Sequence, residues 1–216
     1  KLGDRLSAYY PVFVDVKKRR CIVIGGGTQG AEKVHKLLDC DANVIVISPE
    51  VEEEIKEIAR LEKISWYRRK YKSGDLEGAL LVVVADTTDE TINQQVALEA
   101  QERDILLNVM DVTHLCTFIA PSIVDRGAVS VAISTGGASP ALARKFRQEL
   151  EKSNLIEYAD LAPLLSEVRM ELKTIGKSVD GERWQSCLDE DLLRMVQSGA
   201  LKEAKEILMN GLLDNN

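Results

Sequence analysis

The strongest constraint on this chain is a glycine-rich segment, Gly25–Gly30, with the spacing G-x-G-x-x-G. It follows an apolar run, Arg20–Ile24, and opens a stretch of helical length. In that context Gly25 permits a tight turn, Gly27 lets a pyrophosphate approach the backbone, and Gly30 lets the helix pack against the strand. The free N–H groups at the helix start then face the phosphates. The segment predicts a dinucleotide site, and the alternative is a tight turn without a ligand.

Apolar runs alternate with amphipathic stretches through the first 119 residues, which is the pattern of strand-helix-strand units on a parallel sheet. The apolar runs are unbroken, so helices should cover both faces of the sheet. Pro49 suits the first turn of a helix because it has no N–H to leave unpaired. We expect strands at Arg20–Ile24, Asn43–Ser48, Ile64–Tyr67, Ala79–Ala85 and Ile105–Val109, and helices at Gln29–Cys40, Pro49–Leu61 and Thr88–Arg103.

The pattern changes after Val109. Two further strands are expected, at Thr117–Ala120 and Ala128–Ser134, followed by a helix from Ser139-Pro140 to about Ser153. The remaining sequence contains helical segments without a convincing strand. We therefore expect boundaries near residues 119 and 153, which gives an α/β domain at 1–119, a short segment at 120–153 and a helical C-terminal domain at 154–216.

Charge and hydropathy limit the classes of partner. The chain carries 28 Lys and Arg against 35 Asp and Glu, and no basic stretch studded with aromatic residues, which argues against nucleic acid or an anionic membrane. No apolar run approaches the roughly 20 residues needed to span a bilayer. The first ten residues lack the apolar segment of a secretory signal and begin with Lys, which indicates a trimmed start. We expect a cytoplasmic protein, and the four dispersed cysteines offer no zinc or redox spacing.

The end of the second expected strand is where a dinucleotide-binding unit usually holds the ribose, through an Asp or Glu. Here Ser48 stands in that place, followed by Pro49 and Glu50. Glu50 is a candidate acceptor for the ribose hydroxyls, and no Arg or Lys stands nearby for a 2′-phosphate. NAD is therefore favoured over NADP.

Two features suggest a substrate site. Asp111 follows the fifth strand, and ligands of open α/β sheets bind beyond the carboxyl ends of the strands; the alternative is a turn or cap role. The second feature is the turn Ser134–Pro140, with Ser139 as helix N-cap and Pro140 at the first helical position, which should present several free N–H groups to an anion. Arg144, Lys145 and Arg147 follow on the helix, either facing that anion or simply solvated.

Taken together, these motifs resemble the precorrin-2 dehydrogenase/sirohydrochlorin ferrochelatase family of sirohaem biosynthesis, which includes the N-terminal half of bacterial sirohaem synthase. They occur in the order typical of the family over residues 9–150. The matching segments are Tyr10–Phe13, Val23–Gly27, Ala85–Asp89, Asn108–Asp111, Phe118–Ser122 and Ser134–Arg144.

The resemblance implies an NAD-binding Rossmann domain with a parallel sheet, a short dimerisation segment and a helical C-terminal domain, assembled as a homodimer. It implies oxidation of the tetrapyrrole precorrin-2 to sirohydrochlorin with NAD+ and, in bifunctional members, insertion of Fe2+. Metal insertion would need Asp111 or His114 to accept the pyrrole protons, and no ligand cluster in this sequence dictates it. The alternative for His114 is a loop histidine without a metal role.

The site residues expected on this basis fall into three groups, with Asp111 as the catalytic aspartate. The cofactor-binding candidates are Gly25, Gly27, Thr28, Gln29, Gly30, Ser48, Pro49, Glu50, Ala85 and Thr87. The substrate-binding candidates are Asn108, Thr135, Gly136, Gly137, Ser139 and Arg144. Thr135 stands where some family members carry a phosphorylated serine.

A function of another class shares part of this pattern. An NAD-binding module that senses redox state without catalysis would also need the loop Gly25–Gly30 and the first five strands. It would not need an aspartate in the crevice or the anion turn Gly136–Pro140. The aspartate and the turn therefore distinguish the two functions.

Overall fold

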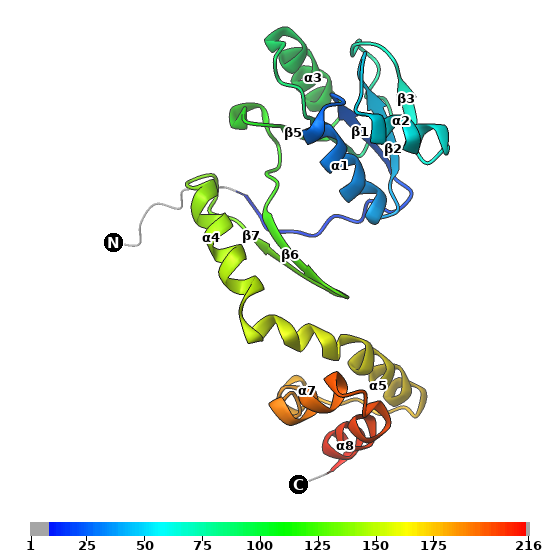
Figure 1. The fold of residues 1–216 in the computed structure, drawn as a ribbon, viewed down its shortest axis with the longest axis vertical. Helices are drawn as coiled ribbons and strands as arrows, with labels where there is room; N and C mark the ends of the chain where they lie inside the picture. Colours follow the sequence, from blue (N-terminus) through cyan, green and yellow to red (C-terminus); the bar gives the residue numbers. More distant parts are fainter. Residues whose placement is uncertain (1–8, 215–216) are drawn as a thin grey trace. The chain divides into compact units, whose positions relative to one another are not determined.

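The computed structural model describes residues 9–214, and the chain divides into two compact units between Ala120 and Pro121 (Figure 1). Residues 1–8, on which part of the expectation about a secretory signal depends, lie outside the described range. Within that range, no helix is long and apolar enough to cross a membrane.

The first unit is built on a five-stranded parallel sheet in the order β3-β2-β1-β4-β5. The central strand β1 pairs with β2 on one side and with β4 on the other, so that Ile24 lies beside both Ile47 and Val84. All five strands were expected close to their observed bounds, and the α/β class is confirmed. The strands are β1 (Arg20–Ile24), β2 (Asn43–Ile47), β3 (Ser65–Tyr67), β4 (Leu81–Val84) and β5 (Leu106–Val109).

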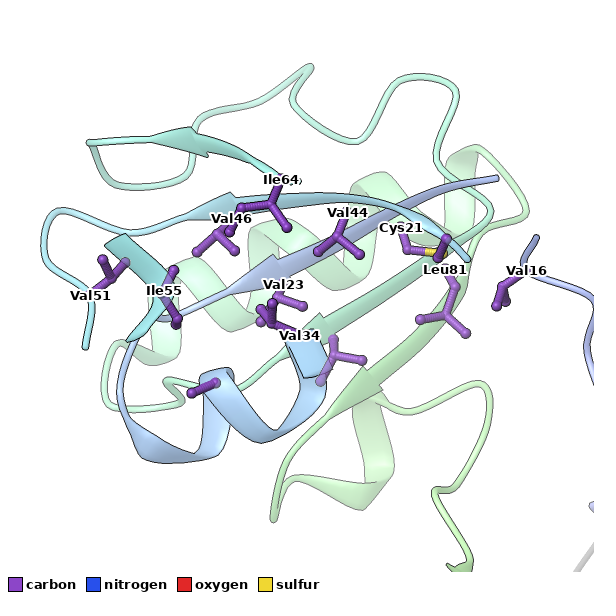
Figure 2. Packing of buried hydrophobic residues seen from close by; sticks show 13 residues of the cluster. Val16, Cys21, Val23, Val34, Val44, Val46, Val51, Ile55, Ile64 and Leu81 are labelled. Atoms are coloured by element: carbon purple, nitrogen blue, oxygen red, sulfur yellow. The ribbon is translucent and has the colours of Figure 1, made fainter. Parts of the chain in front are cut away.

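Helices cover both faces of this sheet, as the unbroken apolar strands predict. One face packs against α1 (Thr28–Asp39) and α2 (Glu53–Arg60), and Figure 2 shows Val34 and Ile55 of these helices beside the strand residue Val23. The other face packs against α3 (Glu90–Glu102) through Val96 and Ala100. Successive residues of β1 therefore enter opposite cores.

The expected start of the second helix is wrong. Pro49 lies in a bend, and α2 begins four residues later, at Glu53. The Ser48 hydroxyl donates to the Glu50 carbonyl (2.6 Å), and the Glu52 N–H donates to the Gly26 carbonyl (2.8 Å). These bonds commit the segment after β2 to a loop against the glycine-rich segment.

The connection from β3 to β4 contains no helix and is held by two buried carboxylates. Asp75 receives two hydrogen bonds from the Arg69 guanidinium (2.6 and 2.7 Å). Glu99, on α3, accepts from the Tyr71 hydroxyl and from the N–H groups of Gly74 (2.9 Å) and Leu76 (3.1 Å). Side chains thus supply the partners that a helix would have supplied internally.

The second unit opens with an antiparallel hairpin, β6 (Ser122–Arg126) and β7 (Val129–Ile133), against which α4 (Pro140–Glu151) packs. The strand expected at Thr117–Ala120 is wrong. Thr117 folds back onto β5 instead, where its N–H donates to the Leu107 carbonyl (2.8 Å) and its hydroxyl accepts from the Leu107 N–H (2.7 Å).

The rest of the second unit is helical, as expected, with a core that includes Leu161, Val168 and Leu208. The Arg126 guanidinium joins the hairpin to the first of these segments through two hydrogen bonds to Asp160 (2.9 and 2.7 Å). The helical segments are η2 (Asn154–Leu161), α5 (Ala162–Thr174), α6 (Gly181–Ser186), α7 (Glu190–Gln197) and α8 (Leu201–Leu213).

Candidate functional site

The glycine-rich segment joins β1 to α1 as predicted, and two of its glycines are sterically required. Gly25 has a φ of +107°, and a Cβ there would lie 2.6 Å from the backbone nitrogen of Asp86. A Cβ at Gly30 would lie 2.3 Å from the Gly25 carbonyl oxygen. Any side chain at either position would force the loop away from its neighbours.

Gly27 has a different environment, because a Cβ at this position would meet nothing within 4 Å. Gly27 is the N-cap of α1, and neither a capping side chain nor an acidic residue occupies the first turn of that helix. The helix start thus keeps unpaired N–H groups and open space beside them. This is the arrangement that accommodates a phosphate group.

A cleft of about 330 Å³ lies at this helix start. It brings together residues from the ends of β1 and β4, where the direction of strand order reverses and ligands of such sheets bind. Its lining residues are Gly27, Thr28, Gln29, Gly30, Ala85 and Asp86. The open cradle at Gly27 and the uncapped helix fit the pyrophosphate of a dinucleotide.

Sequence reasoning missed Asp86, which lines this cleft. Its carboxylate accepts hydrogen bonds from the Thr88 N–H (3.2 Å) and hydroxyl (2.7 Å), which fixes the turn after β4. Thr87, a cofactor candidate, is half-buried beside the cleft lining, and its carbonyl accepts from the buried Asn93 amide (3.0 Å). The sequence signal that could have identified Asp86 is its position just after the carboxyl end of β4, the strand beside which the strand order reverses.

The segment after β2 carries the ribose candidates. Ser48 is buried and its hydroxyl is bonded within the protein, whereas Pro49 and Glu50 are exposed. Gly26 was also missed: a Cβ there would lie 2.3 Å from Val51 Cγ1 and 2.6 Å from the Glu50 carbonyl oxygen. Gly26 therefore sets how closely the segment after β2 approaches the phosphate loop.

Asp111 lies in the turn directly after β5, at the carboxyl edge of the sheet, in the left-handed region at φ +61°. Its side chain is exposed, and within residues 9–214 its carboxylate has no hydrogen-bond partner. The carboxylate is therefore accessible to a ligand at this edge of the sheet. Asn108, a substrate candidate, is instead bonded inside the protein, where its amide nitrogen donates to the Phe118 carbonyl (3.1 Å).

The turn between β7 and α4 belongs to the second unit. Ser139 caps α4, accepting from the Leu142 N–H (3.2 Å), and Pro140 occupies the first turn, as predicted. The expectation of several free N–H groups is wrong, because most of them bond within the turn. Gly136 donates to the Ser134 hydroxyl (3.0 Å), Ala138 to the Thr135 carbonyl (3.1 Å) and Ser139 to the Thr135 hydroxyl (3.0 Å).

The basic residues of α4 also divide into two kinds. Lys145 pairs with Glu149 and Arg147 with Glu151, each at 2.7 Å. Arg144 is exposed, and no carboxylate of the described chain pairs with it. It is therefore available for an external anion.

His114 is exposed in the short helix η1 (Thr113–Leu115), and residues 9–214 hold no group of three or more His, Cys, Asp or Glu side chains arranged for a metal ion.

A parallel sheet with a glycine loop at the end of its central strand and an uncapped helix behind it defines a Rossmann-type dinucleotide-binding protein. Residues 12–122 match the family NAD_binding_7, described as putative NAD(P)-binding, and the chain belongs to this family. Residues 126–153 match the central region of sirohaem biosynthesis proteins.

Relatives of known name agree with this assignment. The chain is 35% identical to the siroheme synthase of Pseudoalteromonas atlantica over 206 residues, which is 94% of this chain and 44% of that protein. It is 34% identical to that of Vesicomyosocius okutanii, over 91% of this chain and 42% of the relative. The chain thus spans less than half the length of these relatives.

A solved structure titled SirC, precorrin-2 dehydrogenase, has a TM-score of 0.73 and 27% identity, and the match covers 92% of this chain and 100% of that one. The resemblance drawn from the motifs is confirmed by these matches, and so are the Rossmann fold and NAD as the cofactor.

Proposed function

We propose that this chain is an NAD-dependent dehydrogenase that oxidises precorrin-2 to sirohydrochlorin. The observation that carries the proposal is an unpartnered carboxylate, Asp111, at the same sheet edge as the dinucleotide cleft. The likeness to a structure titled precorrin-2 dehydrogenase supports this substrate.

The first unit holds the cofactor through the residues of the cleft. The N–H groups at the start of α1 bind the pyrophosphate beside Gly27, and the Glu50 carboxylate accepts hydrogen bonds from the ribose hydroxyls. Residues 48–52 contain no Lys or Arg to neutralise a 2′-phosphate, which favours NAD over NADP. When bound, NAD+ supplies the acceptor for the hydride that leaves the substrate.

Asp111 accepts the proton that leaves the substrate together with that hydride. General base catalysis by a positioned carboxylate contributes typically about 10²- to 10⁴-fold to a rate. Arg144 pairs with a substrate carboxylate, because it is the α4 cation without a partner carboxylate in the described chain. Thr135 and Ser139 shape the turn that precedes this helix.

The proposed protein is a cytoplasmic homodimer with a Rossmann domain at 1–119, a dimerisation segment at 120–153 and a helical domain at 154–216. Apolar side chains exposed on the dimerisation segment support this assembly. On α4, Leu142 is 46% exposed and Phe146 is 54% exposed. Burial of such side chains against a second copy of the chain lowers the free energy of the assembly.

The test is anaerobic oxidation of precorrin-2, followed by NADH absorbance, in the parent protein and two aspartate variants. Asp111→Asn removes the base while keeping a residue type that tolerates the left-handed region. We expect kcat to fall by about 10²-fold or more. Asp104→Asn is the matched control, because Asp104 is also exposed and left-handed (φ +53°) but precedes β5 instead of following it.

Equal rates for Asp111→Asn and the parent protein would remove Asp111 from the mechanism. Binding of NAD+ without turnover of precorrin-2 by the parent protein would overturn the dehydrogenase assignment. That second outcome is the one expected of a regulatory module that senses redox state.

A further inference from the structure

Three side chains anchor the loop that carries Asp111, and we define them as the anchoring cluster: Asn108, Cys116 and Thr117. They lie on either side of the segment 110–115, which leaves β5 and leads back to it. Asn108 lies on β5 itself, whereas Cys116 and Thr117 follow the short helix η1. Together they attach the returning segment to the strand.

Cys116 makes the central contacts. Its sulfur accepts from the Val109 N–H (3.2 Å) and from the Asn108 amide (3.7 Å), and its thiol lies within hydrogen-bond reach of the Val109 carbonyl (3.3 Å). Burial raises the pKa of this thiol above its ordinary value, so that it keeps its hydrogen at neutral pH. A thiol in this place both donates and accepts at the residue where β5 ends.

The other two side chains extend the attachment on either side. The Asn108 amide donates to the Phe118 carbonyl (3.1 Å), and the Thr117 hydroxyl accepts from the Leu107 N–H (2.7 Å). The loop between these points includes Asp111, whose left-handed backbone is unfavourable for a residue with a Cβ. Hydrogen bonds on both sides of the turn hold this backbone in place.

We propose that the anchoring cluster positions the Asp111 carboxylate for proton removal, and that Asn108 serves catalysis through this role instead of by contacting substrate. The proposal deepens the proposed function and rests on it. The members of the cluster are positioning residues, because their polar atoms bond to the loop and to each other. Loss of the hydrogen bonds of the anchoring cluster lets the turn that carries Asp111 relax, and this moves the Asp111 carboxylate away from the substrate.

The first test replaces Cys116 while keeping or removing its hydrogen bonds. Cys116→Ala removes all the hydrogen bonds of the Cys116 sulfur with little loss of volume. We expect kcat to fall by about 10- to 100-fold, the cost of a misplacement of roughly 1 Å. The Kd for NAD+, measured by titration calorimetry, should stay within about twofold of the parent because the cleft residues are untouched. Cys116→Ser, which can donate and accept, should recover most of kcat.

Two further measurements separate positioning from a general loss of structure. Amide hydrogen exchange in segment 109–118 should accelerate in Cys116→Ala while the rest of the first unit is unchanged. Adding Cys116→Ala to Asp111→Asn should lower kcat no further, because the cluster acts through that carboxylate. Cys40→Ala, at the exposed cysteine after α1, is the control and should match the parent.

The outcomes distinguish this inference from the function on which it rests. If Asp111→Asn is inactive but Cys116→Ala turns over at the parent rate, the positioning role is wrong and the dehydrogenase mechanism stands. If the two substitutions lower kcat additively, the cluster does not act through Asp111. If Asp111→Asn keeps the parent rate, both the base assignment and the positioning role are wrong.

Discussion

Gly26 and Gly27 are adjacent in the sequence, yet the space beside each differs. A methyl group on Gly26 would collide with Val51 and Glu50 of the same protein, whereas a methyl group on Gly27 would enter an open cleft. The fold therefore requires a glycine at position 26, whereas only the proposed ligand requires one at position 27. Substitution by alanine separates the two requirements.

We expect Gly26→Ala to lower the free energy of unfolding by about 1–3 kcal/mol, the usual cost of overpacking. Gly27→Ala should cost less, up to about 1 kcal/mol, because the backbone of Gly27 (φ −73°) suits alanine and only the N-cap preference for glycine over alanine is lost. Its Kd for NAD+ should instead rise by tenfold or more, because the methyl group occupies the place of the pyrophosphate. Urea unfolding without cofactor and calorimetric titration with NAD+ check the two halves. Equal NAD+ affinity in Gly27→Ala and the parent would contradict the assigned cradle.

At this scale the sequence allowed some roles to be predicted and not others. The spacing of Gly25 and Gly30 is set by local backbone geometry, so the steric need for glycine at both positions was predictable from the sequence. The environment of Gly26 depends on a loop that is distant in sequence, and no local pattern reports it. Asn108 is an example of the same limit, because its partner Phe118 lies across a loop whose path only the fold determines.

Among the elements, the loop from β3 to β4 depends most on buried charge. Burial by itself would raise the pKa of the Asp75 carboxyl, but hydrogen bonds from the Arg69 guanidinium and the Lys72 N–H hold that pKa below its ordinary value. A depressed pKa in the folded state means that the carboxylate stabilises the fold at neutral pH. This contribution is lost as the pH falls through the folded pKa.

We therefore expect Asp75→Asn to lower the free energy of unfolding by about 2 kcal/mol at pH 7, the scale of hydrogen bonds to a charged group. The difference from the parent should persist down to about pH 4 and shrink below it, as the parent carboxyl becomes protonated. Urea unfolding at pH 7 and pH 3 measures both values. A difference that is equal at the two pH values would show that the charge is irrelevant. Asp39→Asn, at an exposed site, should change stability by less than about 0.5 kcal/mol at either pH.

Prediction of the elements succeeded where apolar burial decides the structure. Strands β1, β2 and β4 are apolar runs whose successive residues enter two cores, so their composition alone indicated them. Pro49 and Thr117–Ala120 were misassigned because propensity is overruled there by tertiary hydrogen bonds, to Gly26 in one case and to Leu107 in the other. Such bonds join segments whose proximity the sequence does not state.

At the scale of the whole molecule, the proposed homodimer depends on apolar residues that neither unit buries by itself. Phe146 on α4 and Leu201 on α8 are each 54% exposed, so Leu201 can serve as the control position for Phe146. A charge should interfere at the proposed interface and be tolerated elsewhere. The two positions thus test where a second copy binds.

We expect Phe146→Glu to convert the protein to a monomer at micromolar concentration, because a buried unpaired carboxylate opposes association. Leu201→Glu should keep the mass of the parent dimer. Light scattering coupled to size-exclusion chromatography gives the mass of each variant. A monomeric parent, or a dimer that survives Phe146→Glu, would contradict this assignment of α4.

The strand order also affects how the protein folds during its synthesis on the ribosome. Among the described strands of the sheet, β1 is synthesised first, but its partner β4 ends at Val84, about sixty residues later in the chain. Until then the apolar run from Cys21 to Ile24 has one side unpaired, and such an edge is prone to wrong pairing. Contacts of this sequence separation also slow folding. Nascent chains whose strand β4 has not yet left the ribosome should therefore be the ones that most need a chaperone, and the nucleotide cleft cannot form before β4 has emerged.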